Sequence, residues 1–169
     1  MSEICASDCG SYRTHRPLDT IERMAEENDW TFDRDSDDEV TVQVSGSWCD
    51  YHMLFVWNDV TEAIFFTCTF DIRIPIEKMK QSYELITMLD KKMWIGHFCI
   101  WEEEGIPIFR HTLPLRDTTG PSHGQIEDVV EAAITECDRF YPAFQHVIWN
   151  GKSAEDAIKL AMIDCVGNA

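Results

Sequence analysis

The spacing of apolar residues divides the chain into helical and extended segments. Where apolar positions recur every three or four residues, an amphipathic helix is predicted; these segments are 17–28, 75–92, 122–149 and 153–165. Where apolar residues alternate with polar ones or run together briefly, a strand is predicted; these segments are 40–44, 51–57, 63–72, 94–101 and 106–115. The predicted order is therefore α-β-β-β-α-β-β-α-α.

This order predicts an α+β fold. Short polar turns join neighbouring strands, so we expect a two-layer structure in which helices cover a five-stranded antiparallel sheet. Pro107 cannot donate to a neighbouring strand, which places 106–115 at an edge or at a bulge. Ser122 with Gln125 forms a capping box at the start of the long C-terminal helix, and Pro142 is expected to kink or break that helix near residue 140.

The charge of the chain excludes some partners. Lys and Arg number 14 against 31 Asp and Glu, a net charge of −17. Nucleic acids and anionic membrane surfaces are therefore poor partners. The acids are dense over 29–39, so we predict a solvated loop there, with Trp30 and Phe32 turned back onto the core.

The ends of the chain carry little structural signal. Residues 1–16 are polar and without a period, so we expect a flexible N-terminal tail followed by a single domain over 17–169. The start lacks the basic and apolar regions of a signal peptide, which makes the cytoplasm the expected location. Seven cysteines without regular spacing agree with free thiols, including Cys5 and Cys9 in the tail.

The sequence contains no familiar catalytic motif. Two pairs of residues nevertheless leave an enzyme as the alternative function. If the hairpin around 102–105 closes with a three-residue loop, His97 faces His111 and the two could share a metal ion. A loop of two or four residues would shift the register and separate them. Cys49 and His52 offer a thiol and an imidazole within four residues. Neither constellation is complete, so we assign no catalytic residue, cofactor or metal.

Five segments together resemble the YbjN family of bacterial proteins. They are residues 17–23 (PLDTIER), 48–52 (WCDYH), 93–98 (MWIGHF), 109–111 (FRH) and 140–153 (FYPAFQHVIWNGKS). Members of this family are described as regulators of sensory transduction, and their fold is similar to that of type III secretion chaperones. The resemblance implies a non-enzymatic, acidic cytoplasmic protein that binds other proteins, acts in signalling or stress response, and often forms a homodimer. It carries over no site residue.

The predicted helices can cover only one of the two faces of the predicted sheet. The segment 51–57 is apolar on both sides, and Phe65 points away from Phe66. Soluble monomers rarely leave a contiguous apolar patch in water, so the C-terminal helix, a second copy or a client protein should cover it. We expect a two-fold homodimer. The candidate partner-binding or dimer residues are Leu54, Val56, Phe65, Trp101 and Trp149.

Overall fold

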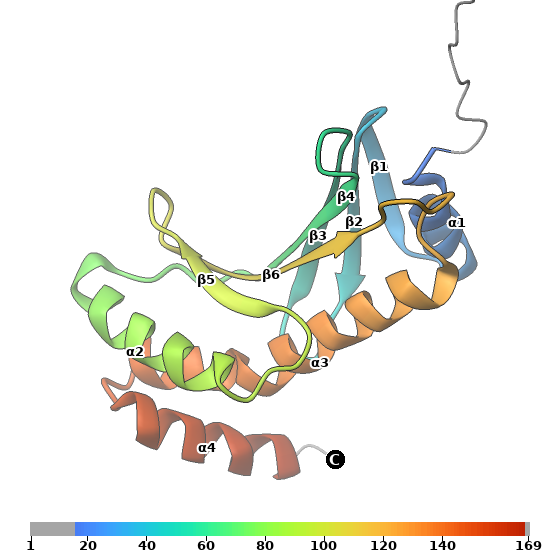
Figure 1. The fold of residues 1–169 in the computed structure, drawn as a ribbon. Helices are drawn as coiled ribbons and strands as arrows, with labels where there is room; N and C mark the ends of the chain where they lie inside the picture. Colours follow the sequence, from blue (N-terminus) through green and yellow to red (C-terminus); the bar gives the residue numbers. More distant parts are fainter. Residues whose placement is uncertain (1–15, 168–169) are drawn as a thin grey trace, which may run out of the picture.

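Six antiparallel strands form one sheet in the order β1-β2-β3-β4-β6-β5, as the computed structural model shows (Figure 1). The structure describes residues 16–167, with side chains to residue 163. The strands are β1 (Thr31–Ser36), β2 (Glu39–Ser45), β3 (Asp50–Asn58), β4 (Ala63–Thr69), β5 (His97–Trp101) and β6 (Ile106–Pro114). The helices are α1 (Asp19–Glu27), the short 3₁₀ helix η1 (Ile76–Lys78), α2 (Met79–Asp90), α3 (His123–Ile148) and α4 (Ala154–Gly167). Cys5 and Cys9 lie outside the described residues.

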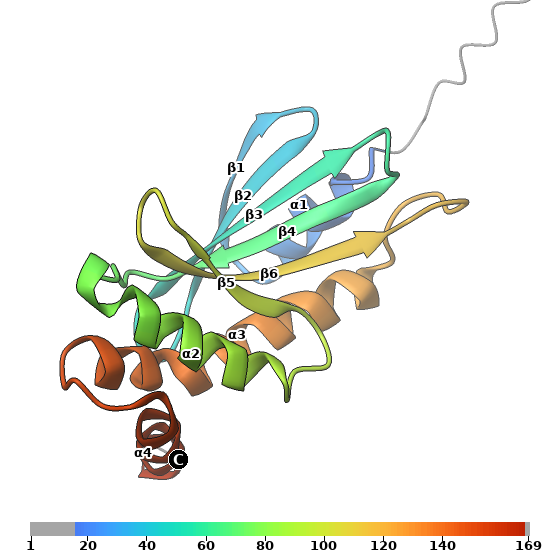
Figure 2. The ribbon, with the colours of Figure 1, turned by 60° about the vertical axis from the view of Figure 1, so that its left-hand side comes forward.

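The helices lie on one side of the sheet. α1 and the long α3 run beneath the inner face, while α2 and α4 pack together beside β5 and the C-terminal half of α3 (Figures 1 and 2). Among the described residues, no helix lies on the opposite, outer face. The fold is thus the α+β class that the apolar pattern predicts, with one strand more than expected.

The sixth strand corrects the prediction of a loop over 29–39. β1 pairs with β2, and its inward positions are Phe32, which packs against the core, and Arg34. The Arg34 guanidinium donates to Glu22 at 2.6 Å and to Asp19 at 3.3 Å, both on α1. These two carboxylates compensate the positive charge of Arg34, which points inward. The sequence alone predicts that such a charge lies in solvent. The acidic residues of β1 point outward, so the segment forms a strand despite its charge.

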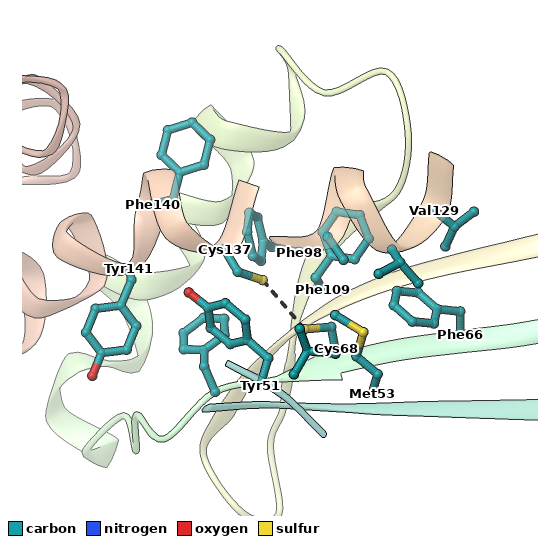
Figure 3. Close-up of a cluster of buried hydrophobic side chains, with 14 of the residues drawn as sticks. Tyr51, Met53, Phe66, Cys68, Phe98, Phe109, Val129, Cys137, Phe140 and Tyr141 are labelled. Atoms are coloured by element: carbon teal, nitrogen blue, oxygen red, sulfur yellow. Dashed lines mark hydrogen bonds between the residues drawn. The ribbon is translucent and has the colours of Figure 1, made fainter. Parts of the chain in front are cut away.

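The core lies between the inner face and α3. Aromatic rings dominate it, and Phe98 packs edge-on against Phe109, Phe140 and Phe144 at centroid separations of 5.8–6.3 Å (Figure 3). Cys68 of β4 and Cys137 of α3 meet in the middle of it, with their sulfur atoms 3.9 Å apart. Both thiols are fully buried, where they act as small apolar groups.

Pro107 does not mark an edge strand, which is the second correction. β6 lies between β4 and β5, and β5 forms the edge. The last β4 pair joins Thr69 to Ile108, so Pro107 lies beyond the end of β4 and pairs only with Ile100 of β5. The missing amide hydrogen therefore costs no bond to β4.

The segment after Pro75 forms a helix one turn later than predicted. A 3₁₀ turn precedes α2. The side of α2 that is buried therefore differs from the side that the apolar spacing predicts. Ile76 and Tyr83 belong to the apolar spacing that predicts the helix over 75–92, yet they are 82% and 38% exposed. The buried residues of α2 are Ser82, Leu85, Ile86 and Leu89. The strand predicted from residue 94 begins only at His97, and Trp94 is 99% exposed.

α3 is one continuous helix of 26 residues with Pro142 inside it, so the predicted break does not occur. The capping box is present: the Ser122 side chain accepts from the amide of Gln125, and Gln125 accepts from the amide of Ser122. Residues 140–144 are all buried, and this packing holds the helix together across the proline. At the start of α4, the Ser153 hydroxyl accepts from the amide of Asp156, as a cap does.

Candidate functional site

A row of six side chains crosses the outer face of the sheet from edge to edge. The strand register aligns them in the order Asp33, Thr41, Leu54, Thr67, Arg110 and His97. They alternate along their strands with the buried residues of the inner face, so their side chains point outward. The next row is Glu39, Val56, Phe65 and Thr112.

The centre of the outer face is apolar. Leu54, Val56 and Phe65, which we call the outer strip, lie on the two central strands and are half-buried. Because α1 and α3 pack on the inner face, no helix among the described residues covers this strip. Thr67 lies beside Leu54 and is 8% exposed. The strip is a continuous apolar surface built from neighbouring strands rather than from one loop.

Charge changes sign across the outer face. Asp33, Asp35 and Glu39 lie on β1 and β2, whereas Arg110 and His97 lie on β6 and β5. In a chain with a net charge of −17, for which His is counted as neutral, the Arg110 guanidinium at this end is an exception. The face therefore has an acidic end, an apolar centre and a basic end.

Arg110 also covers part of the outer strip. Its guanidinium carbon lies 4.5 Å from the centroid of the Phe65 ring, a cation–π contact. Within the described part of the chain no carboxylate forms an ion pair with Arg110. The guanidinium thus keeps its N–H groups available for an acceptor outside its own chain.

The structure brings together three of the five candidate residues. Leu54, Val56 and Phe65 are neighbours across β3 and β4, with Val56 directly paired with Phe65. Trp101, 51% exposed, ends β5 and shares its outward side with His97. Trp149 is 64% exposed but caps the end of α3, which lies on the other side of the sheet, so it is not part of this face.

The two histidines do not pair. Trp101 pairs with Ile106, so the loop comprises residues 102–105, four in all, and His97 lies opposite Arg110. His111 lies opposite Phe66 and points to the inner side of the sheet. Burial lowers the pKa of His111, and the nearby His97 lowers it further. Among the described residues, no cluster of three His, Cys, Asp or Glu side chains could hold a metal ion.

Cys49 and His52 form no thiol–imidazole pair. Cys49 is half-buried just before β3, and burial is the main reason why its pKa rises to about 11, with the Asp71 carboxylate adding to the effect. The thiol therefore stays protonated at neutral pH and is a poor nucleophile. His52 lies on the exposed outer side of β3 between Gln43 and Thr69, and no hydrogen bond joins it to Cys49 in the described structure.

An open groove of about 860 Å³ lies between α2 and the start of α4. Met79, Tyr83 and Met88 line it together with Ser153. The Tyr83 hydroxyl donates to Glu102, and this bond is the main reason why its pKa rises to about 12. The phenol thus remains protonated at neutral pH and does not act as a base.

Sequence reasoning missed the charged residues of the outer face. Asp33 and Asp35 fell inside the segment predicted to be a loop, so no face could be assigned to them. Arg110 shares its alternation with Ile108 and Thr112 in a predicted strand, and that period could have placed it on the side away from Phe109. Its position opposite His97 required the correct loop length.

The chain is thus an α+β protein with helices on one face of its sheet and, on the other face, an apolar strip between an acidic and a basic end. The family model of YbjN, described as "Putative bacterial sensory transduction regulator", matches residues 17–146. The chain therefore belongs to the YbjN family. No curated protein matches it in sequence.

A helix must be long and apolar to cross a membrane. Within the described residues, none is both long enough and apolar enough to cross a bilayer.

Proposed function

We propose that this protein is a non-enzymatic regulator that acts by binding another polypeptide through the outer strip. The observation that carries the proposal is the position of Leu54, Val56 and Phe65 on the sheet face that no described helix covers. Burying such side chains against a partner is favourable by about 25 cal/mol per Å² of apolar area removed from water. The polar ends of the face would orient the partner.

The family description supports a regulatory role, and the candidate chemistry of the chain does not favour an enzyme. The proposed action is chaperone-like: a partner segment is held by apolar burial, while the acidic surface keeps the complex soluble and repels acidic competitors. This role fits a component of bacterial sensory transduction or stress response.

The test compares Phe65→Asp with wild-type protein and with Val60→Asp. Val60 is 93% exposed in the β3–β4 turn, so its replacement adds the same charge away from the face. Polypeptides that a tagged chain retains from a bacterial extract are identified by mass spectrometry, and binding is remeasured by calorimetry with each purified partner. Circular dichroism and thermal melting confirm that both variants fold.

We expect wild-type protein and Val60→Asp to bind the same polypeptide with equal affinity, and Phe65→Asp to lose it. Equal binding by a folded Phe65→Asp would overturn the proposal. It is also overturned if the wild-type chain retains no polypeptide at all, its own copies included.

A further inference from the structure

The aromatic core contains two thiols in contact. The sulfur atoms of Cys68 on β4 and Cys137 on α3 lie 3.9 Å apart, although 69 positions separate the two residues in the chain (Figure 3). We propose that this pair is a redox-sensitive cross-link: a hydroperoxide oxidises the two thiols to a disulfide, which ties α3 to the centre of the sheet. Both side chains lie on the inner side of the sheet, so this inference does not depend on the proposed function of the outer strip.

The geometry selects this pair among the described thiols. A disulfide bond is about 2 Å long, so the two sulfur atoms must approach one another by about a further 2 Å. Rotation of the two side chains and a small shift of α3 toward β4 share this approach. Cys49 and Cys99 are the other described free thiols, and neither sulfur touches a second thiol in the described part of the chain.

Burial decides which oxidant can react. Both thiols are 0% exposed, so a reagent reaches them only during brief openings of the core. Burial also raises the pKa of Cys137 well above its ordinary value, and the contact with Cys68 adds to the shift. An apolar core that disfavours a thiolate also disfavours a bulky charged reagent such as glutathione disulfide. Hydrogen peroxide is neutral and close to water in size, which makes a hydroperoxide the fitting oxidant.

The reaction consumes one hydroperoxide for each cross-link. In the first step one thiol loses its proton and its sulfur attacks a peroxide oxygen. The O–O bond breaks, a sulfenic acid forms, and the leaving hydroxide takes up the proton to become water. In the second step the sulfur of the other thiol attacks the sulfenic sulfur, the S–O bond breaks, and the oxygen leaves with that thiol's proton as a second water. The two thiols together lose two electrons, which reduce the peroxide.

The cross-link would change the stability of a large part of the fold. The bridge closes a loop that contains α2, β5 and β6. A closed loop of this length removes many conformations from the unfolded chain and therefore favours the folded one. Cys137 also precedes Asp138, whose carboxylate accepts hydrogen bonds from Ser47 in the turn between β2 and β3. The disulfide would thus fasten α3 to β4 beside an anchor that already joins α3 to this turn.

Peroxide treatment followed by peptide mapping tests the cross-link directly. The reduced full-length chain is incubated with hydrogen peroxide at neutral pH, catalase removes the excess, and free thiols are alkylated before digestion without reductant. We expect mass spectrometry to find the Cys68 and Cys137 peptides joined, lighter by two hydrogen atoms than their sum, and separated again by dithiothreitol. Cys68→Ala should abolish this product. Cys99→Ala is the matched control, because Cys99 is a half-buried thiol on β5 and its loss should leave the product unchanged.

Urea unfolding of the same samples tests the effect on the fold. We expect oxidised wild-type chain to unfold at a higher urea concentration than reduced chain, and dithiothreitol to reverse the difference. Peroxide-treated Cys68→Ala controls for oxidation of methionine and should show no such rise. The inference is overturned if treated wild-type chain yields no Cys68–Cys137 peptide, or if either thiol is joined to Cys49 instead. It is also overturned if the oxidised chain unfolds at a lower urea concentration. Mapping of the wild-type chain needs no substitution, so it decides the question even if Cys68→Ala folds poorly.

Discussion

The indole Nε1 of Trp48 donates a hydrogen bond of 2.8 Å to the main-chain carbonyl of Asp138. In a regular helix this carbonyl would accept from the residue four positions later, which here is Pro142 and has no amide hydrogen. The proline therefore frees an acceptor, and the turn between β2 and β3 uses it. The Trp48 ring also stacks on Tyr141, with centroids 6.0 Å apart and planes at 4°.

This relationship predicts a coupling between Trp48 and Pro142. Trp48→Phe keeps a ring for the stack but leaves the Asp138 carbonyl without a donor, so we expect a loss of about 1–3 kcal/mol in the free energy of unfolding. Pro142→Ala restores a backbone amide that can donate to the same carbonyl. In that background Trp48→Phe should cost about 1 kcal/mol less. Urea unfolding of the wild-type protein, the two single variants and the double variant measures this coupling.

Additive effects of the two substitutions would show that Pro142 and Trp48 act independently. A coupling of the opposite sign would show that the amide of the new alanine displaces Trp48 at a net cost. Trp149→Phe provides a matched control, because this ring is exposed and its replacement should leave stability within about 0.5 kcal/mol.

The Asp138 side chain holds the same turn from the other side. Its carboxylate accepts from the amide of Ser47 at 2.8 Å, from the Ser47 hydroxyl at 2.8 Å and from the Tyr51 hydroxyl at 2.5 Å. Asp138→Ala leaves these donors without their acceptor, so we expect a destabilisation of about 2–3 kcal/mol by urea unfolding. Asp128→Ala, at an exposed position of the same helix, should change stability by less than about 0.5 kcal/mol. Equal effects would refute the anchoring role of Asp138.

Alkaline pH should destabilise the fold through its buried tyrosines. Burial raises the pKa of Tyr51 far above its ordinary value, with the Asp138 carboxylate adding to the shift. Burial likewise raises the pKa of Tyr141 to about 12, helped by its hydrogen bond to Asp71. Tyrosines of the unfolded chain titrate near about 10, so the unfolded state releases protons first as pH rises.

The unfolding free energy is therefore expected to hold its full value below about pH 10 and to fall as pH rises through the folded pKa values. Urea midpoints measured from neutral to alkaline pH, together with tyrosinate absorbance, test this sign. Tyr141→Phe removes one of the titrating groups and should make the alkaline decline shallower. Stability that rises above about pH 10 would contradict the linkage.

Phe144 should be among the costliest core positions. Its ring is fully buried and contacts Phe70 and Phe98 at centroid separations of 5.5 and 5.8 Å. Phe144→Ala should cost about 3–5 kcal/mol, because it removes apolar burial and leaves a cavity. Ile76→Ala, at an 82% exposed position, is the control. A loss below about 1 kcal/mol at Phe144 would show that this part of α3 is peripheral.

Purified chain should contain no stoichiometric transition metal. His97 and His111 lie opposite different residues and point to opposite sides of the sheet, so they cannot share an ion without a change of register. Elemental analysis of tag-free protein tests this expectation. One tightly held Zn or Fe per chain that disappears in His97→Ala or His111→Ala would contradict it and revive the enzymatic alternative.

Patterns with a period of a few residues were sufficient to place most elements. The alternation over 40–44 and 63–72 predicts β2 and β4, and the Ser122 capping box predicts the start of α3, because each signal acts between near neighbours in the chain. The same local reasoning predicted an apolar second face from Phe65 and Phe66, and the structure places those side chains on opposite sides.

Other features depended on contacts between distant residues. β1 forms although its sequence is charged, because Glu22 on α1 compensates Arg34. The register that separates His97 from His111 depends on a loop whose length the sequence left open. α3 passes through Pro142 because its flanks are buried against the sheet. The sequence by itself determined the class of fold and most of its elements, since periodicity and caps are local. Only the tertiary structure decided which charged residues lie on the outer face and in which order, because that depends on strand order and register.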